Sequence, residues 1–215
     1  MRTALALSAL LFLAACESVY YSAAEQVGIH KRDILVDRVE QSRDAQEDAQ
    51  EQFQSALEQF QTVVAFDGGD LEDVYHKLND EYEDSVKAAA EVSDRIKSVD
   101  SVAKALFKEW KNEIDEYQNA NFKATSQAKL RETRRRYDAM IASMRQAESR
   151  MDPVLAALKD NVLFLKHNLN ARAVASLKTE FRGIEQDVAA LIADMRKSIA
   201  ASNAFIDSMQ NPAEG

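Results

Sequence analysis

The chain has 215 residues, of which 27 are basic and 36 are acidic, giving a formal net charge of −9. Such an acidic chain is a poor partner for nucleic acid, because neutralisation of phosphates dominates that affinity. Five glycines and two prolines among many strong helix formers argue against a turn-rich fold and predict long helices.

The first sixteen residues, MRTALALSALLFLAAC, have the pattern of an exported bacterial lipoprotein. A single arginine precedes an apolar run of about ten residues, too short to cross a hydrocarbon core of ~30 Å. The run ends in a sequence that looks like a lipobox, formed by Leu13, Ala14, Ala15 and Cys16. We expect residues 1–15 to be a signal peptide and Cys16 to carry a diacylglyceryl group and an N-acyl chain. An ordinary signal peptide that happens to carry a cysteine, or a cytosolic apolar helix, is the alternative.

The anchor has consequences for location. Two or more acyl chains hold a protein stably on a membrane, whereas one chain holds it only reversibly. Glu17 follows the cysteine where enteric-type bacteria place aspartate for inner-membrane retention. We therefore expect the periplasmic face of the outer membrane, with the periplasmic face of the inner membrane as the alternative. Residues 16–30 would form the anchor and a tether, and the mature chain would have a net charge of −10.

From residue 31 onward, apolar residues recur at spacings of three and four, the period of an amphipathic helix. The first such stripe stops at a turn in which Gly68 and Gly69 suit a helix end and Asp70 suits the start of the next helix. The stripe comprises Leu35, Val39, Ala49, Phe53, Ala56, Phe60 and Val63, with Ser42 and Gln46 in its polar gaps.

The second stripe runs from Tyr75 to Tyr117 and is diluted at 119–121, after which Thr125 and Ser126 offer a new N-cap. The third stripe runs from residue 130 to 165 and contains Pro153.

We expect Pro153 to kink a continuous helix, because the stripe keeps its phase across it; a fresh helix starting at Asp152–Pro153 is the alternative. The segment 166–170, with Asn168 and Asn170, predicts a tight turn, and an unbroken helix is the alternative. A fourth stripe, from 177 to 209, precedes a tail, 211–215, that we expect to be disordered.

Together these stripes predict an all-α fold, an elongated antiparallel four-helix bundle or coiled coil forming one domain over residues 31–210. The expected helices span roughly 31–66, 70–118, 126–167 and 170–209. Helices of matched length would leave no apolar stripe uncovered. The lipid anchor, the 119–125 turn and the C-terminus would then share the membrane-proximal end, with the Gly68 and Asn168 turns at the other.

Four segments resemble a bacterial domain-of-unknown-function family, number 2959. They are GIHKRDILV at 28–36, FDGGDL at 66–71, LRETRRRY at 130–137 and LKHNLNAR at 165–172. The resemblance covers nearly the whole mature chain. It implies a helical, lipobox-bearing envelope protein without an assigned activity, and it transfers no catalytic residue.

Known catalytic patterns fit the sequence poorly. A di-metal bundle site needs a Glu-x-x-His pair from each of two helices. His76, with Asp73 and Asp80 near it, has no matched pair elsewhere, because His30 lies near the tether and His167 near a turn. Neither a nucleophile elbow nor a phosphate-binding loop is present. We therefore predict a protein that is not an enzyme, with no metal site, no cofactor other than the lipid on Cys16, and no small-molecule substrate.

One cluster of basic residues is a candidate docking patch for a protein or for lipid headgroups. It comprises Lys129, Arg131, Arg134, Arg135 and Arg136. The simpler interpretation pairs these side chains with the acidic segments 37–51 and 67–84. The sequence thus predicts a non-enzymatic lipoprotein acting as a structural or interaction module, with an envelope protein or a second copy as its partner. A membrane-shaping or lipid-binding module is the alternative, and a di-metal bundle protein is the third hypothesis.

Overall fold

The computed structural model describes residues 30–211, which form four helices. They are α2 (Lys31–Val64), α3 (Leu71–Glu116), α4 (Ala120–His167) and α5 (Ala171–Gln210). The predictions for the signal peptide, the lipobox at Leu13, Ala14, Ala15 and Cys16, nearly all of the tether, and the tail beyond residue 211 lie outside the described residues.

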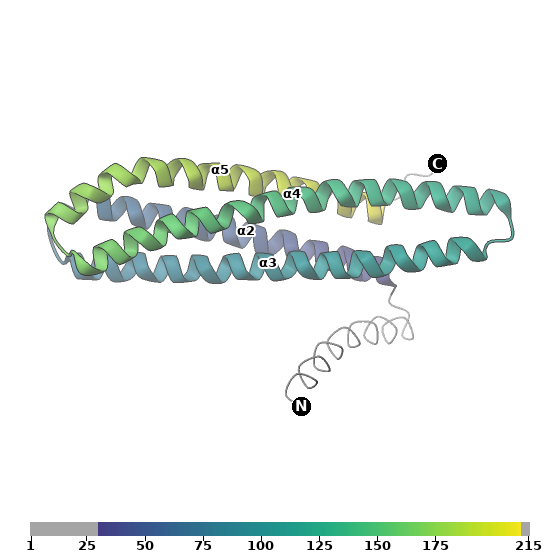
Figure 1. Ribbon diagram of the computed structural model, residues 1–215, viewed down its shortest axis with the longest axis horizontal. Coiled ribbons are helices and arrows are strands. Elements are labelled where there is room, and N and C mark those ends of the chain that lie inside the picture. The colour runs from purple at the N-terminus through teal and green to yellow at the C-terminus, as the bar shows by residue number, and fades with distance from the viewer. Residues whose placement is uncertain (1–29, 212–215) are drawn as a thin grey trace, which may run out of the picture.

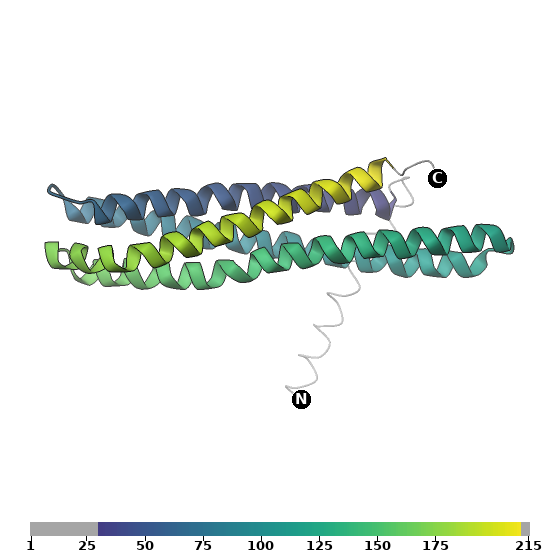
Figure 2. The same cartoon turned by 90° about the horizontal axis from the view of Figure 1, so that it is seen from above.

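The four helices run antiparallel to their neighbours and form an elongated bundle (Figures 1 and 2). α2 packs against α3 and α5, and α4 packs against the same two helices from the other side. The starts of α2 and α5 lie at opposite ends, as expected for an up-down-up-down topology. No residue between 30 and 211 lies in a strand. The predicted all-α antiparallel bundle is confirmed.

The core follows the predicted stripes. Leu35, Phe53 and Phe60 are fully buried on α2, and the polar Ser42 and Gln46 are buried in the gaps between them. Apolar residues of all four helices join one hydrophobic cluster along the four-helix section of the bundle. Burial of this cluster is the main force that holds the helices together.

The turn between α2 and α3 has the predicted construction. Gly69 adopts φ +113°, a region that favours glycine because it lacks a Cβ. The carboxylate of Asp70 then accepts hydrogen bonds from the backbone N–H of Glu72 at 2.9 Å and of Asp73 at 3.4 Å. The cap satisfies two of the unpaired donors at the start of α3.

The predicted start of the third helix is wrong by about two turns. α4 begins at Ala120, and its N-cap is Asn119, whose side-chain oxygen accepts from the N–H of Asn121 and Phe122 at 2.9 and 3.2 Å. Residues 125 and 126 lie inside the helix. The dilution of the stripe therefore begins at the turn, residues 117–119, and continues into the first turns of α4, which α2 and α5 do not cover.

The segment around residue 168 is a turn, as predicted. α4 ends at His167, and Asn170 caps α5 by accepting from the N–H of Arg172 and Ala173 at 3.0 and 3.1 Å. Pro153 lies inside the unbroken helix α4, so Asp152–Pro153 does not start a new helix.

The helices differ in length, contrary to the expectation of matched stripes. α3 and α4 have 46 and 48 residues, against 34 in α2 and 40 in α5. Their connected ends therefore extend past the start of α2 and the end of α5 (Figures 1 and 2). We call residues 111–128 the projecting hairpin. The opposite end, which holds the Gly68–Gly69 turn and the α4–α5 turn, is the far end.

Candidate functional site

The predicted basic cluster lies on α4 where the four-helix section gives way to the projecting hairpin. Lys31, near the start of α2, forms an ion pair with Glu109 of α3 at 3.0 Å. Arg32 donates a hydrogen bond to the backbone carbonyl of Met209, near the end of α5. These contacts fix where α2 begins relative to α3 and where α5 ends relative to α2. They also confirm that the start of α2, the α3–α4 turn and the end of α5 share one end.

The arginines of the cluster find their partners close by. Arg136 forms an ion pair with Glu132 one helical turn away, and Arg135 lies 4.0 Å from the same carboxylate. The guanidinium of Arg134 lies 5.7 Å from the centre of the Phe107 ring on α3, within cation–π range. Arg135 and Arg136 thus pair within α4 rather than with the acidic segments 37–51 and 67–84.

A cleft opens beside the cluster because α3 and α4 lose two neighbouring helices there. Its volume is about 590 Å³. Leu106, Trp110 and Met209 provide its apolar surface, and the indole N–H of Trp110 donates to the hydroxyl of Ser126 at 2.9 Å. We call it the shoulder cleft; its other lining residues are His30, Lys31, Arg32, Glu109, Glu113, Lys129, Glu132, Thr133, Arg136 and Ser208.

Asp100 ties α3 to α4 in the four-helix section. Its carboxylate lies 2.7 Å from Lys104 Nζ and 3.1 Å from Arg145, and it accepts from the Tyr137 hydroxyl at 2.9 Å. Partial burial opposes ionisation of Asp100, but hydrogen bonds from Lys104 and Tyr137 outweigh it and hold the pKa below its usual value. Burial and the bond to Asp100 raise the pKa of the Tyr137 phenol, which stays protonated.

Asp194 plays the same part between α4 and α5. It pairs with Arg150 of α4, and Lys197 Nζ lies 3.1 Å from it. The hydrogen bond from Arg150 lowers the pKa of Asp194, although desolvation acts in the opposite direction. Both networks link neighbouring helices, α3 to α4 through Asp100 and α4 to α5 through Asp194. The sequence did not predict them, because each depends on how two helices align.

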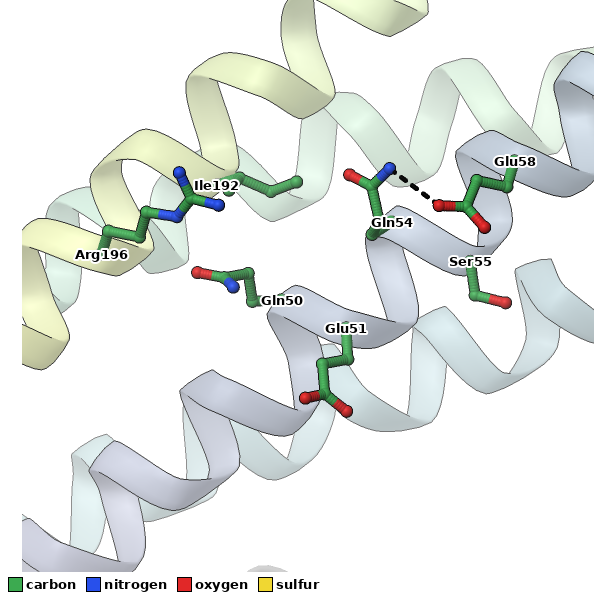
Figure 3. Close-up of a pocket in the computed structure, with 7 residues that line it drawn as sticks. All are labelled: Gln50, Glu51, Gln54, Ser55, Glu58, Ile192 and Arg196. Atoms are coloured by element: carbon green, nitrogen blue, oxygen red, sulfur yellow. Dashed lines mark hydrogen bonds between the residues drawn. The ribbon is translucent and has the colours of Figure 1, made fainter.

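A polar groove of about 310 Å³ runs between α2 and α5 (Figure 3). Gln50 and Gln54 rise from α2 on the side facing α5, where Ile192 and Arg196 form the other wall. Gln54 donates to Glu58 at 3.1 Å. Glu51 and Ser55 complete the lining. The groove holds no arrangement of nucleophile, base and oxyanion donor that catalysis requires.

Large apolar side chains are exposed at both ends of the bundle. In the projecting hairpin, Tyr117 is 44% exposed and Phe122 is 63% exposed. At the far end, Leu163, Phe164 and Leu169 are 40–44% exposed. Phe122 stands out in the sequence as the one large apolar residue between 118 and 129. Its exposure could not be predicted, because it depends on the hairpin projecting beyond α2 and α5.

The remaining candidate residues are dispersed. His76 is exposed on α3, with its Nε2 3.8 Å from a carboxylate oxygen of Glu72. Within residues 30–211, no three His, Cys, Asp or Glu side chains gather in a way that could hold a metal ion. Among the helices described, none has an apolar stretch sufficient to cross a membrane.

The fold and these surfaces define an elongated all-α bundle with exposed apolar side chains at its ends. The chain belongs to the family described as protein of unknown function (DUF2959), whose model matches residues 20–209. The resemblance noted in the sequence is thereby confirmed. No curated protein and no solved structure matches the chain.

Proposed function

We propose that this protein is a non-enzymatic lipoprotein of the bacterial outer membrane, facing the periplasm, that presents its far end to a partner protein of the envelope. The observation that carries the proposal is the exposure of three large apolar side chains close together in the sequence at the far end, Leu163, Phe164 and Leu169, which we call the far-end patch. Exposed apolar residues that cluster on a helical bundle are typical of protein interaction sites.

The topology supports a division of roles between the two ends. The segment that follows Cys16 enters the bundle at His30, beside the projecting hairpin. The patch lies at the opposite end of α2, whose 34 residues span roughly 50 Å. An acyl anchor at one end would therefore leave the patch free to bind a partner away from the point of attachment.

Photo-cross-linking in intact cells tests the far end, with a photoreactive residue at Leu169 compared with one at Val86. Val86 is a matched control, because it is 39% exposed but lies within α3, about four helical turns from the far end. We expect one dominant envelope protein to be captured from Leu169 and not from Val86. Equal capture from both positions would exclude a specific far-end site.

The anchor is tested separately with Cys16→Ser. We expect the native protein to sediment with outer membranes and the variant to be lost from that fraction. Mass spectrometry of the native N-terminal peptide should show the added acyl mass. An unmodified thiol at Cys16 would contradict the lipoprotein part of the proposal and leave the far-end site to be judged by cross-linking.

A further inference from the structure

The projecting hairpin carries core-stripe residues to a place where no helix of the same chain covers them. Tyr117 continues the stripe of α3 past Ile114, and Phe122 lies in the first turn of α4. Both are exposed, whereas Ile114, one turn before Tyr117, is only 3% exposed. Uncovered aromatic side chains at the tip of a two-helix hairpin point to a binding partner.

The shoulder cleft is the complementary feature. It lies where α2 begins and α5 ends, and its surface combines Leu106, Trp110 and Met209 with charged side chains. A pair of helices arriving from outside would take the positions that α2 and α5 leave empty. We propose that this pair is the projecting hairpin of a second copy of the chain, so that two hairpins together complete a four-helix bundle.

A two-fold axis makes this contact self-complementary. If two projecting hairpins lie side by side in opposite directions, the tip of each reaches the shoulder cleft of the other. The same contact then forms twice, and the assembly closes as a dimer without further growth. Phe122 and Tyr117 of one copy would fill the apolar part of the other copy's cleft, as aromatic anchors do at interface centres.

Charge favours a second copy over an anionic lipid surface. Near the tip, Asp115 and Glu116 outnumber Lys123, which lies 3.5 Å from Asp115. The shoulder cleft has four cationic side chains against three carboxylates, with Lys129 and Arg136 on α4. The tip is therefore slightly negative and the cleft slightly positive. An anionic leaflet would repel the tip, whereas a second shoulder cleft would attract it.

The inference goes beyond the proposed function, because the dimer does not depend on the acyl anchor or on the far-end partner. The dimer would nevertheless determine where the acyl anchors and the far-end patches lie. Two bundles joined through their hairpins would place both anchors near the centre of the dimer and the two far-end patches at its extremities. One dimer would then hold two partner sites apart on the membrane.

Charge exchange tests the contact on the purified full-length chain in detergent, by sedimentation velocity over a range of concentrations. One variant reverses the cleft with Lys129→Glu and Arg136→Glu, and the other reverses the tip with Asp115→Lys and Glu116→Lys. We expect each variant alone to dimerise at least ~10-fold more weakly than the native chain. In an equimolar mixture both contacts pair opposite charges again, so dimers should return.

A disulfide test locates the contact. Phe122→Cys combined with Thr133→Cys places two thiols eleven residues apart on α4, roughly 16 Å within one chain. A disulfide needs Cα atoms within about 7 Å, so oxidation can join these positions only between copies. The native chain and a Val86→Cys variant are oxidised in parallel, which measures any dimer formed through Cys16 or by random collision.

We expect covalent dimers from the 122–133 pair well above both controls. A native chain that remains monomeric, or a mixture of charge variants that does not recover, would overturn the proposal. Phe122-dependent flotation of the protein with phosphatidylglycerol vesicles, without linked dimers, would assign the tip to lipid and also overturn it.

Discussion

Up to about residue 110, α3 faces α2 as well as α4; beyond it, α3 and α4 face only each other. The two regions belong to the same helices but differ in what they bury. In the four-helix section, α3 buries an apolar residue at nearly every turn, including Val92, Ile96 and Val99. In the projecting hairpin, residues 111–128, Ile114 is the sole buried residue.

The two regions are stabilised by different kinds of interaction. In the hairpin, the Asn119 cap satisfies donors at the start of α4, and the hydrogen bond from Trp110 to Ser126 joins α3 to α4 at the hairpin's base. The four-helix section relies on burial from several sides and on the Asp100 and Asp194 networks. We therefore expect the two regions to respond differently to the same change.

The largest effect is expected from Ile96→Ala in the four-helix section. Ile96 and Ile114 lie on the same helix and are both 3% exposed, so they form a matched pair. Replacing a buried isoleucine with alanine costs about 2–5 kcal/mol, and more where the site cannot collapse. We expect Ile96→Ala to lower the free energy of unfolding by about 3–4 kcal/mol, measured by urea denaturation.

Ile114→Ala serves as the comparison, and we expect a loss of about 2 kcal/mol or less. Only α4 packs over Ile114 within one chain, so the hairpin can close around the missing side chain. Equal losses for the two variants would mean that the hairpin is as tightly packed as the four-helix section.

The turns at the two ends differ in their need for glycine, which predicts a smaller effect. Gly69 has φ +113°, whereas no non-glycine residue from 30 to 211 has a positive φ, including those of the α3–α4 turn. Gly69→Ala should cost about 1–3 kcal/mol through backbone strain. Gln118→Ala in the α3–α4 turn should be close to neutral, and Gly183→Ala inside α5, where a Cβ meets nothing within 4 Å, should stabilise. Thermal denaturation of the three variants would show this order, and a neutral Gly69→Ala would contradict it.

Much of the fold was predictable because periodicity alone identifies the buried face of a long helix. Leu35, Val39 and Phe53 were assigned to the core by spacing and are fully buried. The turns at Gly68 and Asn168 were predictable because they carry residues that suit helix ends. The α4 start was missed because dilution of the stripe near residue 120 has two explanations, a loop or an uncovered helix, and sequence does not separate them.

The candidate site was predictable only in part. The basic cluster on α4 is visible in the sequence, and so is the spacing that pairs Arg136 with Glu132. The shoulder cleft could not be foreseen, because it results from unequal helix lengths. The packing of Arg134 on Phe107 depends on how α3 and α4 align, which local patterns do not specify.

The smallest expected losses of stability come from replacing the helix N-caps at the two ends of the bundle. Asn119 and Asn170 each accept two backbone hydrogen bonds at a helix start, and replacing such a cap with alanine costs about 1 kcal/mol. Asn170→Ala should lower the free energy of global unfolding by this full amount, because α5 contributes to the four-helix core from its first turn. Ala173 and Val174 are buried there. Asn119→Ala should lower the free energy of global unfolding by less, because the hairpin can fray without opening the core.

Hydrogen exchange makes the distinction direct. Asn119→Ala should speed amide exchange in residues 120–126 and leave the core amides of α2 unchanged. Asn119→Asp, which keeps the acceptor, should restore slow exchange and controls for the loss of the side chain itself. If Asn119→Ala instead lowers global stability as much as Asn170→Ala, then the hairpin unfolds together with the core. In the proposed dimer a second copy would cover the hairpin and produce the same coupling, so the comparison is sharpest at concentrations where the protein is monomeric.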